Sequence, residues 1–464
     1  MSHNRLRRVA PLLAALIAPG ALAHEAPPRG SNLSGTDLRP LPLLGSSDRV
    51  SSGSAFNPDI SVIIDTVYFS KSGDADEPAG FDAGHHHGHG HDHGHGLEEG
   101  FNLREAEIVF SASVDNYFDA ALNVAVTEHD IEVEEAWIAT RSLPSGLRLK
   151  AGKFLSDIGY INAQHPHDWA FVDRPLVNEF LFGDHGLQEK GVQLTWLPPL
   201  PVYTLFGVEL LQGESEGIAP YVGAGRVSHV TVVPDDQGNP RRIRWRDDNP
   251  FKDRQGPRLV TGFAKFGPDL GDDHALQFGI SGGRANSFQR DDLHSSLRYE
   301  TWDGSAWFAG ADAVYKYDAG RPFGQGSLTL QGEYFYREID ADFREFRFHD
   351  GDLTLTNALS RTAKQDGLYV QALYGIAPRW QVGLRAEGVG LRNDNALVED
   401  DFFRSFDPSY RYSTNLTFRP TEFSMLRAQV NHLDYATADN HRDRGWEFML
   451  QLQVALGVHG AHKF

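Results

Sequence analysis

The chain has 464 residues, a formal net charge of −20 at pH 7 and no cysteine. The lack of cysteine excludes a disulfide scaffold, thiolate metal sites and thiol nucleophiles. The acidic balance argues against nucleic acid as a partner and favours a surface that attracts cations.

The first 23 residues have the pattern of a secretory signal peptide. Three arginines between residues 5 and 8 form a basic start, residues 9–17 form a short apolar run, and Ala21 and Ala23 form a small-x-small cleavage motif. The apolar run is too short to cross a bilayer as a helix. An uncleaved N-terminal anchor is the alternative. Cleavage would remove three arginines and no acidic residue, which takes the net charge from −20 to −23.

Residues 24–57 are rich in Pro, Ser and Gly without periodicity, and we expect a flexible periplasmic leader there. From residue 58 to 464 apolar and polar residues alternate with a period of two, which is typical of β-strands. No apolar run in this region is long enough for a transmembrane helix. The clearest predicted strand is the last one, where one face carries Trp446, Phe448, Leu450, Leu452, Val454, Leu456 and Val458.

The alternation predicts sixteen strands, and a count of fourteen or eighteen also fits the pattern. A soluble sandwich alternates too, but many segments have the length that a tilted strand needs to cross a bilayer. Aromatic residues gather at segment ends, as in interfacial girdles: Tyr68, Phe69, Phe101, Trp196, Trp380, Phe418 and Phe423. The predicted strands lie near residues 58–70, 101–115, 117–128, 131–141, 146–155, 188–197, 201–212, 256–267, 273–285, 305–317, 325–338, 366–376, 379–391, 407–419, 422–434 and 443–458.

Short turns alternate with long connections, which is the pattern of an outer-membrane barrel with short periplasmic turns and long external loops. The fold prediction is an all-β, transmembrane antiparallel β-barrel with an aqueous lumen. Phe464 follows the closing strand, and a terminal aromatic residue is typical of the signal that the barrel-assembly machinery reads. We therefore expect a protein surrounded by lipid in the outer membrane of a Gram-negative bacterium. The predicted external loops are 71–100, 156–187, 213–255, 286–304 and 339–365.

A histidine-rich tract occupies the first external loop. Neutral imidazole is a good ligand for zinc, copper and nickel, and glycine lets the backbone wrap around an ion. The tract cannot bury apolar surface, so we expect a mobile loop that binds metal loosely and releases it fast. A solvated spacer or an engineered tag is the alternative, although the run is interior and interrupted by Gly and Asp. The candidate ligands are His85, His86, His87, His89, His91, Asp92, His93 and His95.

The loop 156–187 is a second candidate metal site. Pro166 stiffens the spacing between His165 and His167 and predicts an extended segment. Together with Asp168 these histidines make a chemically reasonable ligand set, and His185 is a further candidate. This is the third external loop, which in general porins folds inward and narrows the channel. The alternative is a loop tied down by hydrogen bonds, with His and Asp as caps.

Other polar groups carry less information. For His459 and His462, near the C-terminus, we favour an incidental position over a role as metal ligands. The sequence contains neither G-x-S-x-G nor H-E-x-x-H, and nothing places a nucleophile beside a base, so we expect no enzyme. Charged residues of both signs face the predicted lumen, as a water-filled pore wall requires: Arg104, Glu105, Glu107, Glu132, Glu134, Arg148, Lys150, Glu333, Arg337, Arg385, Glu387 and Arg427.

The blocks GKFLSDIGY at 152–160 and QHPHDWAFVD at 164–173 resemble the bacterial zinc-regulated outer-membrane receptors often labelled TonB-dependent. NPDIS at 57–61, QGEYF at 331–335 and AHKF at 461–464 fit as well, so the resemblance covers essentially the mature chain. It implies an outer-membrane protein that is expressed when zinc is scarce and imports zinc. By motif position it carries over only His165 and His167 as metal-binding residues.

The expected function is uptake of a divalent transition metal, most simply zinc, with nickel, copper and cobalt as alternatives. A general solute porin or a surface metal buffer are the other readings. TonB-dependent transporters have a plug inside 22 strands, whereas only residues 24–57 precede the first predicted strand. We therefore expect passive or facilitated diffusion. Coupling to TonB is the open alternative. A periplasmic zinc-binding protein would accept the ion. By analogy with other sixteen-stranded porins, a homotrimer is the expected assembly.

Overall fold

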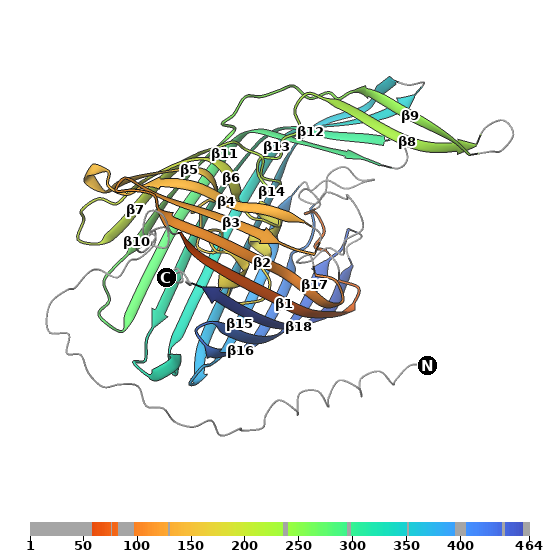
Figure 1. Ribbon diagram of the computed structural model, residues 1–464. Coiled ribbons are helices and arrows are strands. Elements are labelled where there is room, and N and C mark those ends of the chain that lie inside the picture. Colours follow the sequence, from red (N-terminus) through yellow and green to blue (C-terminus); the bar gives the residue numbers. More distant parts are fainter. Residues whose placement is uncertain are drawn as a thin grey trace, which may run out of the picture. The chain divides into compact units, whose positions relative to one another are not determined.

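The computed structural model describes residues 58–75, 77–81, 97–128, 130–234, 240–294, 298–349, 352–394, 405–438 and 441–457. Within these ranges sixteen antiparallel strands form a closed barrel (Figure 1), in which β1 pairs with both β2 and β18. This confirms the predicted fold. The predicted signal peptide with Ala21 and Ala23, the leader, the tract His85–His95 and Phe464 lie outside the described residues.

Every predicted strand is present, with ends that differ by a few residues except at the long strands described below. The barrel strands are β1 (Asp59–Gly73), β2 (Gly100–Ser113), β3 (Phe118–Val126), β4 (Ile131–Thr140), β5 (Leu147–Leu155), β6 (Gln188–Trp196), β7 (Tyr203–Leu211), β10 (Leu259–Gly267), β11 (His274–Leu293), β12 (Arg298–Tyr317), β13 (Leu328–His349), β14 (Asp352–Ala377), β15 (Trp380–Asp394), β16 (Ser409–Thr421), β17 (Ser424–Ala436) and β18 (Arg442–Gly457). Two of the short turns contain 3₁₀ helices, η3 (Pro144–Gly146) and η5 (Pro322–Gly324).

The alternation separates a lipid-facing surface from a lumenal one. On β18 the side chains of Trp446, Leu450 and Leu452 are exposed, whereas Gln451 and Gln453, which point to the opposite face, are buried inside the barrel. The apolar exterior faces lipid in a bilayer, so its exposure carries no hydrophobic penalty. The paired strands leave no edge with unsatisfied backbone groups. Among the described residues no helix has the length and apolar character of a membrane span.

One predicted girdle residue faces the other way. Phe69 is buried on the lumenal side, where it packs with Val67, Val172 and Met449. Its neighbour Tyr68 packs edge-on against Phe101, with ring centroids 5.1 Å apart, as an interfacial aromatic pair would. Two adjacent strand residues point to opposite faces, so only one of the pair can belong to the girdle.

Three predicted external loops are wrong in part. The loop 213–255 contains a separate two-stranded sheet of β8 (Arg226–Pro234) and β9 (Pro240–Asp248). Residues assigned to the loops 286–304 and 339–365 instead extend β11 to β14 beyond the other strands (Figure 1). Beyond the bilayer a strand has no lipid-facing side, so its apolar alternation fades. The hairpin β8–β9 packs on these extensions through Val227, Tyr299 and Phe348.

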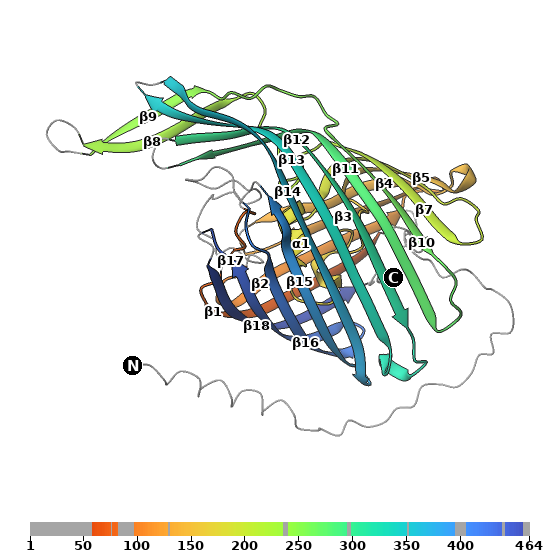
Figure 2. The same cartoon turned by 180° about the vertical axis from the view of Figure 1, so that it is seen from behind.

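Segment 156–187 lies inside the barrel, held by wall residues from several sides. Glu333 on β13 accepts hydrogen bonds from the backbone N–H groups of Tyr160 and Ile161 at 2.9 and 2.6 Å. Arg337 on β13 donates to the carbonyl of Leu181 at 2.9 Å. The short helix α1 (Leu176–Phe182) contacts β13, β14 and β15 and lies within the ring of strands (Figure 2). Its apolar residues join wall aromatics in one buried core: Val177, Phe180, Leu181, Phe182, Phe308, Phe335 and Tyr369.

Candidate metal site in the barrel lumen

The inward-folded segment presents its histidine pair on a tight turn. Pro166 begins a 3₁₀ turn, η4 (Pro166–Asp168), in which the backbone N–H of Asp168 donates to the carbonyl of His165 at 2.9 Å. His165 itself is extended, as predicted, but His167 lies within the turn, which corrects the expected extended conformation. Proline suits the first position of such a turn, because its missing N–H would be unpaired there anyway. The turn brings both imidazoles to the wall formed by β2, β3 and β4.

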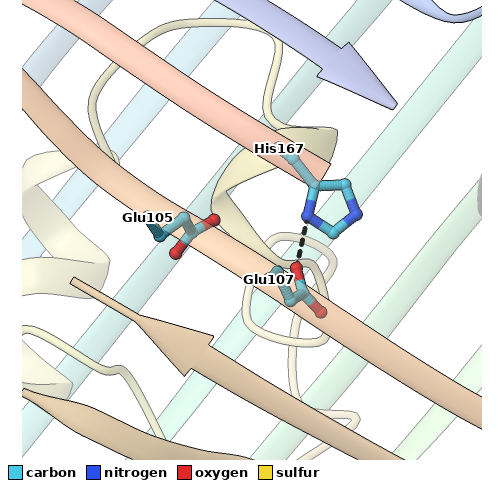
Figure 3. A group of neighbouring side chains, drawn as sticks. All are labelled: Glu105, Glu107 and His167. Carbon is cyan, nitrogen blue, oxygen red and sulfur yellow. Dashed lines mark ion pairs between the residues drawn. The ribbon is translucent and has the colours of Figure 1, made fainter. Parts of the chain in front are cut away.

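Glu107 on β2 lies between the two histidines. Its Oε2 is 2.7 Å from His167 Nδ1 (Figure 3), and its Oε1 is 3.7 Å from His165 Nδ1. Glu107 is fully buried, and the two histidine side chains are about nine-tenths buried. A buried carboxylate requires compensation by positive charge or hydrogen bonds. The wall carboxylate and the loop imidazoles therefore form one electrostatic unit.

A β-bulge aims a second carboxylate at the site. Across the β3–β4 pair, Asn123 is opposite Glu135 and Val124 is opposite Val133, which leaves Glu134 as the extra residue. Bulges redirect side chains that regular alternation would place on opposite faces. Accordingly both acids approach His165: Glu134 Oε2 lies 3.3 Å from Nδ1, and Glu135 Oε2 lies 3.9 Å from Nε2.

A second bulge shapes the β2 side. Across the β1–β2 pair, Asp65 is opposite Glu105 and Thr66 is opposite Leu103, so Arg104 is the extra residue. Arg104 forms an ion pair with Asp65 and donates a hydrogen bond to the carbonyl of Pro166 at 3.2 Å. The arginine thereby positions the histidine turn. Glu105 is buried on the same strand as Glu107 and faces the group around His167 (Figure 3).

Asn123 orients the ligands from outside the group. Its Nδ2 donates to Glu107 Oε1 at 3.0 Å and lies 3.2 Å from His165 Nε2. Within the described part of the chain, the buried atom Glu105 Oε1 makes no hydrogen bond. Buried polar atoms are nearly always satisfied, and a bound ion is one way to satisfy them.

The surrounding carboxylates change the titration of the imidazoles. Burial lowers the pKa of His167, but Asp168 and Glu107 outweigh it and raise the pKa to about 9. For His165, burial again lowers the pKa, while Glu107, Glu134 and Glu135 raise it well above its usual value. Metal ions bind neutral imidazole, so a cation and a proton compete for these nitrogens.

The arrangement contains two sets of three groups whose ligand atoms lie within 4.8 Å of one another. One set is Glu105, Glu107 and His167, and the other is Glu107, Glu134 and His165. Imidazole nitrogen with carboxylate oxygen is a donor set that suits zinc and other divalent transition metals. The residues present therefore fit a transition-metal site.

The structure brings together only part of the predicted ligand set. Asp168 lies beside the site, with Oδ1 3.7 Å from His167 Nε2, but it belongs to neither set of three. His185 is exposed after α1 and also lies outside both sets. Sequence reasoning assigned Glu105, Glu107 and Glu134 to a solvated pore wall and did not pair them with the histidines. Only the strand register and the two bulges reveal that pairing.

A closed antiparallel barrel with an apolar exterior and a polar lumen defines the class of outer-membrane β-barrel proteins. The protein resides in the outer membrane of a Gram-negative bacterium and has a porin-like fold. No family model matches the sequence. An uncharacterized protein of Aquifex aeolicus (strain VF5) is 34% identical over 417 residues, covering 88% of this chain and 80% of that protein. The chain belongs to the same family as this Aquifex aeolicus protein.

Solved structures of several outer-membrane proteins are similar to this chain at low sequence identity. OmpT of Vibrio cholerae is 11% identical with a TM-score of 0.47, covering 88% of this chain and 100% of that structure. The channel DcaP of Acinetobacter baumannii is 11% identical with a TM-score of 0.48, covering 86% and 96%. The anion-selective porin of Comamonas acidovorans is 7% identical with a TM-score of 0.47, covering 86% and 99%.

Proposed function

We propose that the protein is a channel for a divalent transition metal, with zinc as the ion that fits best, and that the lumenal site binds the ion in transit. The observation that carries this proposal is the meeting of His165 and His167 with the buried carboxylates of Glu107 and Glu134. Zinc accepts histidine and carboxylate ligands in several geometries. Nickel, copper and cobalt share the preference for imidazole and are the competing ions.

The histidine-rich tract, residues 85–95, supplies ions to this site in our proposal. It offers more ligands than one ion needs, which favours loose binding and fast release. The resemblance to zinc-regulated receptors supports import of zinc towards the periplasm. A barrel of sixteen strands differs from the 22 of plugged TonB-dependent transporters, which favours passive or facilitated diffusion. A periplasmic zinc-binding protein and a homotrimer remain parts of the proposal.

A general solute porin is the second candidate. The observation in its favour is a lumenal wall with buried charges of both signs away from the histidines, such as Arg385, Glu387 and Arg411. Arg385 and Arg411 each pair with Glu387, at 2.7 and 2.8 Å. A wall of this kind suits many small polar solutes. A surface metal buffer, the third candidate, would bind metal without passing it.

Calorimetric titration of the purified full-length barrel with zinc, nickel, copper and cobalt tests metal binding at the lumenal site. The wild type should show a tight class of zinc site that the double variant His165→Ala/His167→Ala lacks. His185→Ala is the matched control, because this exposed histidine belongs to the same segment but to neither ligand set. Identical isotherms for the wild type and the double variant would contradict the proposal and favour the general porin.

A further inference from the structure

We infer that the lumenal site holds two divalent cations side by side, with the carboxylate of Glu107 as the bridge between them. This inference rests on the proposed function and adds the number and arrangement of the ions. One cation would bind Glu105, Glu107 and His167, and the other would bind Glu107, Glu134 and His165. Glu107 is the only residue that the two sets share.

The two oxygens of Glu107 are already divided between the two histidines. Oε2 faces His167 Nδ1 at 2.7 Å, and Oε1 faces His165 Nδ1 at 3.7 Å. A carboxylate that bridges two metals uses one oxygen for each ion. Asn123 donates to Oε1 at 3.0 Å, which fixes the plane of the carboxylate and hence the direction of both oxygens. Such support of ligating groups is typical of metal sites.

The orientation of the imidazoles opposes a single shared ion. The rings of His165 and His167 are stacked, with planes inclined by 10° and centroids 5.7 Å apart. The lone pair of an imidazole nitrogen lies in the ring plane, so two nearly parallel rings direct their lone pairs along separate planes. Zinc–nitrogen bonds are about 2.0–2.1 Å long. Each ring therefore serves a cation of its own more readily than both rings serve one.

The charge balance also favours two cations. Glu105, Glu107 and Glu134 are each at least nine-tenths buried, and Asp168 and Glu135 lie beside the histidines. With neutral imidazoles, one divalent cation would leave most of this negative charge uncompensated in a buried environment, which is costly. A second divalent cation brings the group close to neutrality.

Anomalous diffraction at the zinc edge, from crystals of the full-length barrel equilibrated with zinc, tests this inference directly. We expect two peaks in the lumen, about 3.5–4 Å apart as in other two-metal sites. Glu105→Gln should remove the peak beside His167 and keep the other. Glu134→Gln should do the reverse, and Glu107→Gln should remove or weaken both.

Glu132→Gln is the matched control, since Glu132 lies on β4 near Glu134 but pairs with Lys153 at 2.8 Å. It should leave both peaks in place. A single wild-type peak between the imidazoles would overturn the bridged pair and leave the proposed metal site standing. Two peaks that both survive Glu107→Gln would overturn the bridge. The absence of any lumenal peak would overturn the pair and the proposed function together.

Discussion

His167 Nδ1 lies 2.7 Å from Glu107 Oε2, so a residue of the inward-folded segment and a residue of the barrel wall form one ion pair. Because the two residues are far apart in the sequence, their distance depends on how the wall holds segment 156–187. The predictions below therefore concern both the ligands and the residues that anchor this segment.

Removing the residue that orients the ligands should weaken metal binding. Asn123 holds Glu107 Oε1 and lies against His165 Nε2. Loss of such an outer-sphere partner costs roughly 10- to 100-fold in metal affinity, and we expect Asn123→Ala to fall in that range for zinc. Asn415→Ala is the control, because Asn415 donates to the carbonyl of Ala170 on the same segment but lies outside both ligand sets. Equal losses in the two variants would assign Asn123 a merely structural role.

Removing a buried charge should release the segment from the wall. Asp173 is fully buried and pairs with Arg385 and Arg411. Asp173→Ala would leave two buried guanidinium groups without this partner, and breaking a buried ion pair costs about 3–5 kcal/mol. The temperature at which the barrel unfolds on gel electrophoresis should fall, and single-channel conductance should rise. Asp184→Ala, in the same segment but exposed, should change both quantities far less.

The buried acid of α1 should make stability depend on pH. Burial raises the pKa of Glu179, Arg411 opposes this, and the net pKa is about 8. The folded chain therefore holds this carboxyl neutral above pH 4.5, where the unfolded chain ionises it. Its contribution to stability is complete below about pH 4.5 and is lost as the pH rises through about 8.

Glu179→Gln should abolish this dependence, since glutamine stays neutral at every pH. Its gain in free energy of unfolding over the wild type should be small at pH 4.5 and large at pH 9, on the order of a few kcal/mol, because one pKa unit is about 1.4 kcal/mol. The exposed Glu216→Gln should show no such trend. Parallel curves for Glu179→Gln and the wild type would contradict the assignment.

Deleting residues 85–95 should affect supply but not the lumenal site. At limiting zinc we expect slower uptake by cells that carry the deletion, because fewer ions are held near the entrance. At saturating zinc the two uptake rates should converge. Uptake that is unchanged at every zinc concentration would contradict the proposal that residues 85–95 supply ions. It would not bear on the lumenal site.

Period-two alternation predicted the barrel because the bilayer imposes it on every spanning strand. It missed the hairpin β8–β9, whose strand Pro240–Asp248 carries four arginines and has no lipid-facing side. It also ended β11 and β13 too early and began β12 and β14 too late, at the points where the strands leave the apolar environment. Sequence patterns report the solvent on each face, and outside the membrane both faces meet water or protein.

The histidines of the site could be predicted from the sequence, and their partners could not. His165 and His167 stand out as two ligands around a stiff proline. Glu107 and Glu134 look like any other charged residue of a pore wall. Their place beside the histidines depends on the inward path of the loop and on the bulge at Glu134, neither of which alternation can show.

Zinc flux into proteoliposomes that contain a zinc-sensitive dye tests the central claim most directly. The wild-type barrel should admit zinc at a rate that saturates with concentration. Glu107→Ala should lose at least about tenfold of that rate at low zinc, because the shared ligand of the site is gone, whereas His185→Ala should match the wild type. Equal zinc entry through the wild type and Glu107→Ala, or no entry through the wild type, would contradict a lumenal metal site that serves transport.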